Sequence, residues 1–130
     1  MVGFFDSGMG GWCVLEAFRR LCPDEPTLYF ADTGNCPYGN KPPEEIERRS
    51  KEIAADLIAR GCEVVVVACN TATAAAIDTL RATWPDTPFV GMEPAVKPAA
   101  LGSRTGVVGV LVTRGTFNGR LYRSTSARAA

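Results

Sequence analysis

The sequence predicts an α/β fold in which a parallel, doubly wound sheet is flanked by helices. Three observations carry this prediction. Short apolar runs alternate with longer amphipathic segments, which is the pattern of parallel α/β proteins. Each apolar run ends in a glycine or polar turn. The run at residues 64–68 is β-branched and does not alternate, as expected for a central strand covered on both faces.

Turn and cap signals define the individual elements. Pro42 and Pro43 suit the first turn of a helix, and Gly61 supplies the stop of that helix. Thr116 suits the cap of a last helix that runs towards Ala127. The predicted elements, in order, are strand 2–5, a helix ending near residue 21, strand 27–31, helix 42–60, strand 64–68, helix 71–84, strand 89–91, strand 107–112 and the last helix.

A chain of 130 residues is long enough for one buried core and short for two complete ones. Residues 94–104 mix prolines, small residues and turn signals, so they are the predicted domain boundary. We expect a first α/β lobe of flavodoxin-like type over residues 1–94 and the truncated start of a second, similar lobe over residues 95–130. A fifth strand without neighbours exposes a hydrophobic edge, so self-association is also expected.

The charges balance, with 14 basic and 14 acidic residues, which argues against nucleic acid or an anionic membrane as a partner. Their distribution is uneven, because the 37 residues after Glu93 hold 6 bases and no acid. Either a basic solvated face has its acidic partners elsewhere, or this segment binds anions. The scattered, single placement of the bases favours the first interpretation.

The chain has 5 cysteines, no CxxC pair and no histidine, which disfavours both a metal site and a disulfide framework. The N-terminus lacks the pattern of a secretory signal. No stretch approaches the roughly 20 apolar residues of a membrane span. We therefore expect a reduced, cytoplasmic location.

Candidate site residues follow the strands, because ligands of open parallel sheets bind beyond the carboxyl ends of the strands. Cys69 comes between an apolar strand and a helix start, where amide donors and the helix dipole favour a thiolate that titrates nearer neutrality. Asn70 is a good N-cap, and with Thr71 it offers groups that bind a carboxylate. The alternative is that Cys69 is a small buried residue that ends a strand.

Other positions near this edge also have two interpretations. Asp6 is either a buried acid placed for proton traffic or a helix cap. Tyr38 and Gly39 either donate a hydroxyl and an amide to a small anion or form a tight turn. Asp32 is a second site acid or a turn-former, of which the second is favoured. Cys36 would line the site, whereas Cys13, Cys22 and Cys62 suit packing on helices or helix ends.

Four segments together resemble successive signatures of the glutamate racemase family. Each segment alone is modest, but their order and spacing are specific, and the resemblance extends to about Tyr122. The segments are FDSGMGG at residues 5–11, ADT at 31–33 with PYG at 37–39, VACNTA at 67–72 and EPAVK at 93–97. In addition, GVVGVLVT at 106–113 resembles the strand that opens the second lobe of that family.

The resemblance implies a two-lobed enzyme that interconverts L- and D-glutamate without a cofactor or metal, for peptidoglycan synthesis. It implies that Cys69 is a catalytic thiol assisted by Asp6. It also implies a set of residues that bind the substrate glutamate: Ser7, Tyr38, Gly39, Asn70 and Thr71.

One departure from the family pattern matters most. The family's second catalytic cysteine lies in a later Gly-Cys-Thr-His stretch, which residues 1–130 do not contain. The chain alone is therefore expected to be inactive as a racemase, or to be a fragment of an active one. A racemase for aspartate or another amino acid, and a non-catalytic binding or regulatory homologue, remain as alternatives. A nucleotide binder is disfavoured, because the glycines at 8–11 match neither GxGxxG nor a Walker loop.

Overall fold

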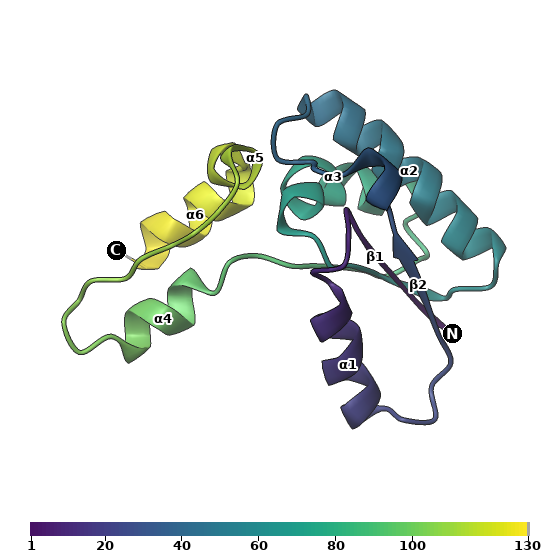
Figure 1. Cartoon of the computed structure of the whole chain (residues 1–130), viewed down its shortest axis with the longest axis horizontal. Coiled ribbons are helices and arrows are strands. Elements are labelled where there is room, and N and C mark those ends of the chain that lie inside the picture. Colours follow the sequence, from purple (N-terminus) through teal and green to yellow (C-terminus); the bar gives the residue numbers. More distant parts are fainter. Residues whose placement is uncertain (130) are drawn as a thin grey trace.

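The sheet of this chain has four parallel strands in the order β2-β1-β3-β4. A computed structural model describes residues 1–129 (Figure 1). Its strands are β1 Val2–Asp6, β2 Thr27–Ala31, β3 Val64–Val67 and β4 Phe89–Gly91. The predicted α/β fold with a parallel sheet flanked by helices is confirmed.

Helices cover both faces of the sheet. The predicted start of a helix at the prolines and its stop at Gly61 are confirmed, and Gly61 has a φ of 92°, in the left-handed region that glycine tolerates. The helices that cover the sheet are α1 Trp12–Leu21, α2 Pro43–Ala59 and α3 Asn70–Thr83, and the later helices are α4 Val96–Gly102, α5 Arg114–Asn118 and α6 Arg120–Ala129.

The central strands are buried on both faces, which explains why their sequences do not alternate in polarity. Phe5, Val65 and Val67 point to one face and join a core with α2 and α3. Phe4 and Val66 point to the other face and pack with α1. Figure 1 shows α1 below the sheet and α2 and α3 above it. The two faces of the sheet therefore hold two separate apolar clusters.

The predicted fifth strand at residues 107–112 is wrong. This segment forms no strand in the described part of the chain, and Val107 and Leu111 are exposed. A β-prone sequence becomes a strand only when a neighbouring strand accepts its hydrogen bonds, and none lies beside it here. The predicted cap of the last helix is also shifted. Thr113 rather than Thr116 caps α5, and α6 begins separately after Gly119.

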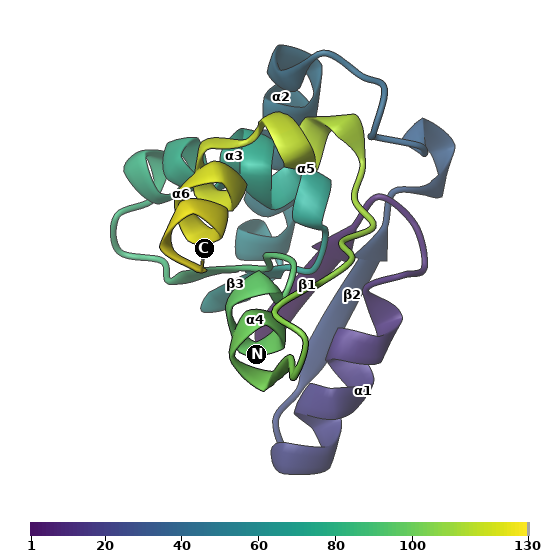
Figure 2. The ribbon, with the colours of Figure 1, turned by 90° about the vertical axis from the view of Figure 1, so that its left-hand side faces the viewer.

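The last helices lie to one side of the sheet, where α5 and α6 contact α3 and α4 contacts α6 (Figure 2). An ion pair of 2.6 Å between Arg120 and Asp78 joins α6 to α3. The division into lobes 1–94 and 95–130 remains a prediction. Among residues 1–129, no helix has the length and apolar character needed to cross a bilayer.

Gly3 leaves no room for a side chain in the centre of β1. A Cβ at this position would lie 2.9 Å from Cys62 Sγ and 3.3 Å from Leu57 Cδ1. We predict that Gly3→Ala lowers the free energy of unfolding by about 1–3 kcal/mol, since the buried neighbours must move. Urea unfolding measures the loss. Gly34→Ala is the matched control, because a Cβ at Gly34 meets nothing within 4 Å. Equal stability of the two variants would contradict the packing described here.

Candidate functional site

The carboxyl ends of β1 and β3 bring two distant segments together. Phe5 pairs with Val67 in the parallel register, so the residues that follow each strand meet at one edge. There the Cys69 thiol lies 3.7 Å from the Ser7 hydroxyl and donates a hydrogen bond to it. The predicted convergence of these two turns on one edge of the sheet is therefore observed.

Cys69 is itself the N-cap of α3. Its Sγ accepts a hydrogen bond of 3.4 Å from the Ala72 amide, which is one of the unpaired donors of the first helical turn. The prediction that Asn70 is the cap is wrong by one residue, and Asn70 is the exposed first residue of the helix. Cys69 is only 6% exposed and also contacts the core.

Burial dominates the protonation of this thiol. It raises the pKa of Cys69 above the ordinary value of 9.0, against the hydrogen bond from Ala72, and the charge of Asp6 raises the pKa further. The prediction that the Cys69 thiol titrates nearer neutrality is therefore wrong. The helix start is present as predicted, but the loss of hydration outweighs it. The resting side chain is a neutral thiol at neutral pH.

Asp6 holds the turn between β1 and α1. Its buried carboxylate accepts a hydrogen bond of 2.9 Å from the Gly11 amide. A Cβ at Gly11 would lie 2.7 Å from Ala68 Cβ, so this close approach requires glycine. The hydroxyl of Tyr29 donates to the carbonyl of Gly8 in the same turn, at 3.2 Å. Asp6 is buried, as predicted for a site acid, but it is not the cap of α1, because Gly11 is the N-cap and the helix has no side-chain cap. A role of Asp6 in proton transfer stays a prediction.

Tyr29 is a neighbour of the site that sequence reasoning missed. Burial raises its pKa to about 12, and the charges of Asp6, Cys13 and Cys69 add to this effect. The only signal for it in the sequence is a polar group within an apolar strand. Cys13 and Cys22 are exposed, so the prediction that they pack as small apolar residues is wrong, whereas Cys62 is buried as expected.

Asp32 is the centre of a buried hydrogen-bond network. Its backbone begins the turn Thr33–Asn35, as predicted for a turn-former. Its buried carboxylate accepts two hydrogen bonds from Arg49, at 2.8 and 2.9 Å, one from Asn35 and one from the Tyr38 hydroxyl. Burial alone would raise its pKa, but these donors outweigh it and lower the pKa to about 2.

The Tyr38 side chain is therefore turned into the protein. It is 2% exposed and its hydroxyl is 2.5 Å from Asp32 Oδ2. Burial and the hydrogen bond to Asp32 raise its pKa. The expected donation of this hydroxyl to a small anion is not what this structure shows. Gly39, the next residue, lies against Thr113, which would be 2.9 Å from a Cβ at Gly39.

Three threonine hydroxyls join the first part of the site to the later part of the chain. Thr71 Oγ1 is 2.8 Å from Thr113 Oγ1 and 3.4 Å from Thr116 Oγ1. Sequence reasoning selected Thr71 and missed the other two, because 42 residues separate Thr113 from Thr71. These hydroxyls form a polar cluster beside Gly39.

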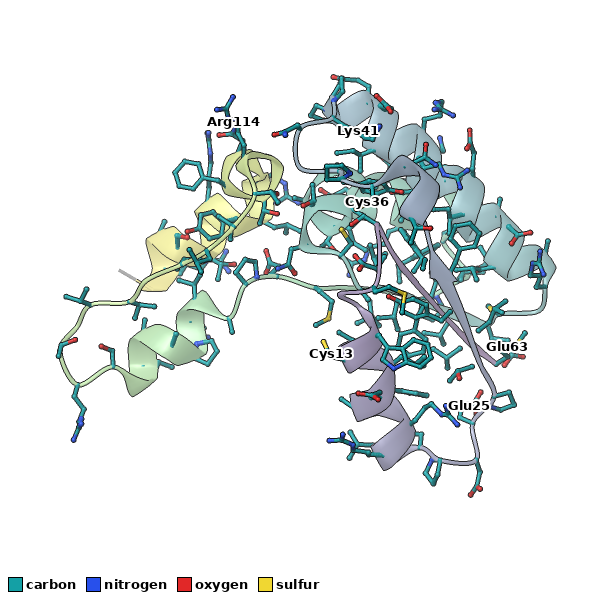
Figure 3. All side chains as sticks on the ribbon, viewed as in Figure 1. Cys13, Glu25, Cys36, Lys41, Glu63 and Arg114 are labelled. Carbon is teal, nitrogen blue, oxygen red and sulfur yellow. The ribbon has the colours of Figure 1, made fainter. Side chains whose placement is uncertain are left out.

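A cavity of about 600 Å³ opens on the outer side of Gly39 and Thr71. Lys41 and Arg114 lie on its opposite sides (Figure 3). Cys36, expected to line the site, is exposed and lies 3.7 Å from a Cβ placed at Gly8. In residues 1–129 no group of three or more histidine, cysteine or acidic side chains is placed to hold a metal ion.

The fold agrees with the comparison to known proteins. The chain belongs to the Asp/Glu/Hydantoin racemase family, whose model matches residues 13–130. Within that family it is a homologue of glutamate racemase. It is 54% identical over 129 residues to the glutamate racemase of Roseiflexus sp., and 50% identical to that of Pseudomonas entomophila.

Solved structures agree with this relationship. The glutamate racemase of Escherichia coli, in complex with L-glutamate and the activator UDP-MurNAc-Ala, is 39% identical and superposes with a TM-score of 0.90, covering 99% of this chain. That of Thermus thermophilus, in complex with β-chloro-D-alanine, is 43% identical with a TM-score of 0.82 and covers 95% of this chain. The chain spans about half the length of these relatives, 47–49%.

The network around Asp32 predicts a specific loss of stability in acid. A carboxylate with a folded pKa of about 2 and an ordinary value of 3.8 contributes about 2 kcal/mol above pH 4, which is lost as the pH falls towards 2. Urea unfolding between pH 6 and 2 should therefore show a steeper loss for the native chain than for Asp32→Asn. Asp78→Asn removes an exposed ion pair and is the control. Parallel curves for the native chain and Asp32→Asn would contradict the prediction.

The raised pKa of Cys69 predicts slow alkylation at neutral pH. We expect iodoacetamide at pH 7.5 to modify the exposed Cys13, Cys22 and Cys36 first, because the reactive thiolate is scarce and buried at Cys69. The rate at Cys69 should rise with pH beyond 9. Mass spectrometry of the digested protein gives the rate at each cysteine. Modification of Cys69 as rapid as that of Cys22 at pH 7.5 would contradict this assignment.

Proposed function

We propose that this chain is the lobe of a cofactor-independent glutamate racemase that supplies Cys69 as one of two thiol acid/bases. The observation that carries the proposal is the position of the Cys69 sulfur, between Ser7 and the first turn of α3. A buried cysteine between a hydroxyl and the amides of a helix start is suited to proton transfer next to a bound anion. The relationship to glutamate racemases supports the same role.

The chemistry explains why a second thiol is required. The α-proton of an amino acid is very weakly acidic, and inversion needs removal on one face and delivery on the other. In the resting state Cys69 is a neutral thiol, so it is the proton donor for one enantiomer and becomes the base when the reaction runs in reverse. The opposite group would come from the part of the protein that residues 1–130 do not contain.

The substrate carboxylate would bind at the start of α3. The amides of this 14-residue helix and the hydroxyls of Ser7 and Thr71 supply donors for an anion, and the backbone of Gly39 and the exposed side chain of Asn70 complete the set. Such donors stabilise the charge that spreads into the carboxylate as the proton leaves. We assign Tyr38 to the substrate-binding set because it precedes Gly39 in this loop. Its hydroxyl donates to Asp32 and is not assigned to the substrate.

Asp6 is the proposed assisting acid. It is buried, and its charge raises the pKa of Cys69, which supports this role. One carboxylate oxygen accepts from the Gly11 amide. The other oxygen is suited to accept a proton from the thiol or to hold the substrate ammonium group.

Glutamate is the proposed substrate because two related racemases have been solved with it. The Escherichia coli enzyme binds L-glutamate, and that of Francisella tularensis, 28% identical, binds D-glutamate. Supply of D-glutamate for peptidoglycan in the cytoplasm, without a cofactor, is the role that follows for the whole protein. Aspartate is the competing substrate, since the family also includes aspartate racemases.

A non-catalytic binding or regulatory homologue is the second candidate. One observation favours it: burial raises the pKa of Cys69, so the thiol is neutral at neutral pH. Such a protein would bind glutamate without exchanging its α-proton.

Hydrogen exchange distinguishes the two functions. We predict that the native chain, incubated in heavy water with each enantiomer of glutamate, slowly places deuterium on the α-carbon of one enantiomer without inverting it. One thiol can remove and return the proton only on its own face. Cys69→Ser should lower the rate by about 100-fold or more, whereas Cys22→Ser, at an exposed thiol, should leave it unchanged. Proton NMR measures the incorporation.

The outcomes separate the hypotheses. Binding of glutamate, seen as shifts of the Ser7, Gly39 and Thr71 amides, with no exchange above the Cys69→Ser level favours the non-catalytic homologue. Exchange of aspartate in preference to glutamate indicates the related racemase. If neither amino acid binds or exchanges, the isolated chain does not form the proposed site.

A further inference from the structure

Arg49 is remote from the sheet-edge thiol in sequence, yet it is linked to the site by a continuous chain of contacts. It lies on α2 and donates two hydrogen bonds to Asp32, 17 residues earlier. Asp32 in turn accepts from the Tyr38 hydroxyl. Tyr38 adjoins Gly39, whose backbone lies against Thr113 and, through it, Thr71.

The geometry around Gly39 leaves little room for movement. A Cβ there would lie 2.9 Å from Thr113 Cγ2 and 3.0 Å from Thr113 Cβ. A shift of this loop by a fraction of an ångström therefore changes where the Gly39 amide points relative to the Thr71 hydroxyl. Polar groups that bind a carboxylate depend on placement of this accuracy.

Resting on the function proposed above, we propose that Arg49 is a positioning residue: through Asp32 and Tyr38 it holds the loop at residues 33–39 so that Gly39 meets the carboxylate of glutamate. Arg49 does not touch the substrate. The planar guanidinium of Arg49 donates to both oxygens of Asp32. This two-point contact fixes the orientation of the carboxylate that accepts the hydrogen bond from the Tyr38 hydroxyl.

Two further contacts hold the Arg49 side chain in place. Its Nη1 lies 3.1 Å from Glu52, and its guanidinium carbon lies 5.7 Å from the centre of the Phe30 ring. It is about a quarter exposed, at 27%, while its partner carboxylate is 4% exposed. A buried ion pair is weak evidence for stability, because loss of hydration offsets the attraction. A role in placing the loop accounts for the convergence of four donors on one carboxylate.

The test uses the whole 130-residue chain. Arg49→Gln breaks the contact, Arg49→Lys keeps the charge without the two-point geometry, and Arg48→Gln on the same helix is the control. Arg48 is exposed and pairs only with Glu52 among the described residues. The readouts are the dissociation constant for glutamate, hydrogen exchange at the Gly39 amide, and urea unfolding. Tyr38→Phe, alone and combined with Arg49→Gln, forms a double-mutant cycle.

We expect Arg49→Gln to weaken glutamate binding about 10-fold or more, as for loss of a hydrogen bond to a charged group. Arg49→Lys should recover part of the loss, and Arg48→Gln should change nothing. Because Arg49 acts through Tyr38, the double variant should bind little worse than Arg49→Gln alone. If Arg49→Gln does not fold, glutamate binding is measured for Arg49→Lys and for Tyr38→Phe instead. Each of these two variants must then bind glutamate more weakly than the native chain.

Two results would overturn the positioning role. One is an Arg49→Gln variant that is less stable than the native chain but binds glutamate with the same dissociation constant. The other is full additivity in the cycle. If the native chain itself binds no glutamate, the proposed function fails. Hydrogen exchange at the Gly39 amide then tests whether Arg49 places the loop. Amide exchange about 10-fold faster in Arg49→Gln than in Arg48→Gln supports the placement of the loop by Arg49, and equal exchange refutes it.

Discussion

The position of β1 between β2 and β3 is the constraint on which the site depends. Its parallel pairing sets Asp6 opposite Ala31 and Phe5 opposite Val67. A shift of one residue would exchange Phe4 and Phe5 between two faces that each need a large apolar side chain, so the register is strongly fixed. With this register, Ser7 and Cys69 must emerge at the same edge, although 62 residues separate them. Helix packing refines the site, but strand pairing creates it.

The same packing has two opposite effects on the protonation of the Cys69 thiol. The end of a buried strand places Cys69 at the first turn of α3, where amides favour the thiolate, but the strand end also removes water, which favours the neutral thiol. Burial prevails in this structure. The consequence is chemical, because a neutral thiol can deliver a proton and needs a change in its surroundings to remove one. Sequence position alone indicates the helix start and gives no measure of the hydration that is lost.

Most of the fold was predictable because it depends on local patterns. Four apolar runs became strands, and three amphipathic segments became helices within a residue or two of their predicted ends. The fifth run at residues 107–112 did not, since strand formation depends on a partner and not only on β-propensity. Cys69 could be selected from its place between strand and helix. Arg49 and Thr113 could not, because their contacts with the site arise only when distant parts of the chain pack together.

Two buried carboxylates, Asp6 and Asp32, follow neighbouring strands, and their surroundings assign them different tasks. Asp32 has four donors from Arg49, Tyr38 and Asn35 around it and a pKa of about 2, so it stays ionised and cannot take up a proton during a reaction. Asp6 accepts a single side-chain hydrogen bond within residues 1–129, from the Gly11 amide, and keeps the capacity to accept another. A carboxylate saturated with donors serves as an anchor. Asp6 keeps spare capacity and its charge raises the pKa of the Cys69 thiol, which supports the proton-transfer role proposed for it.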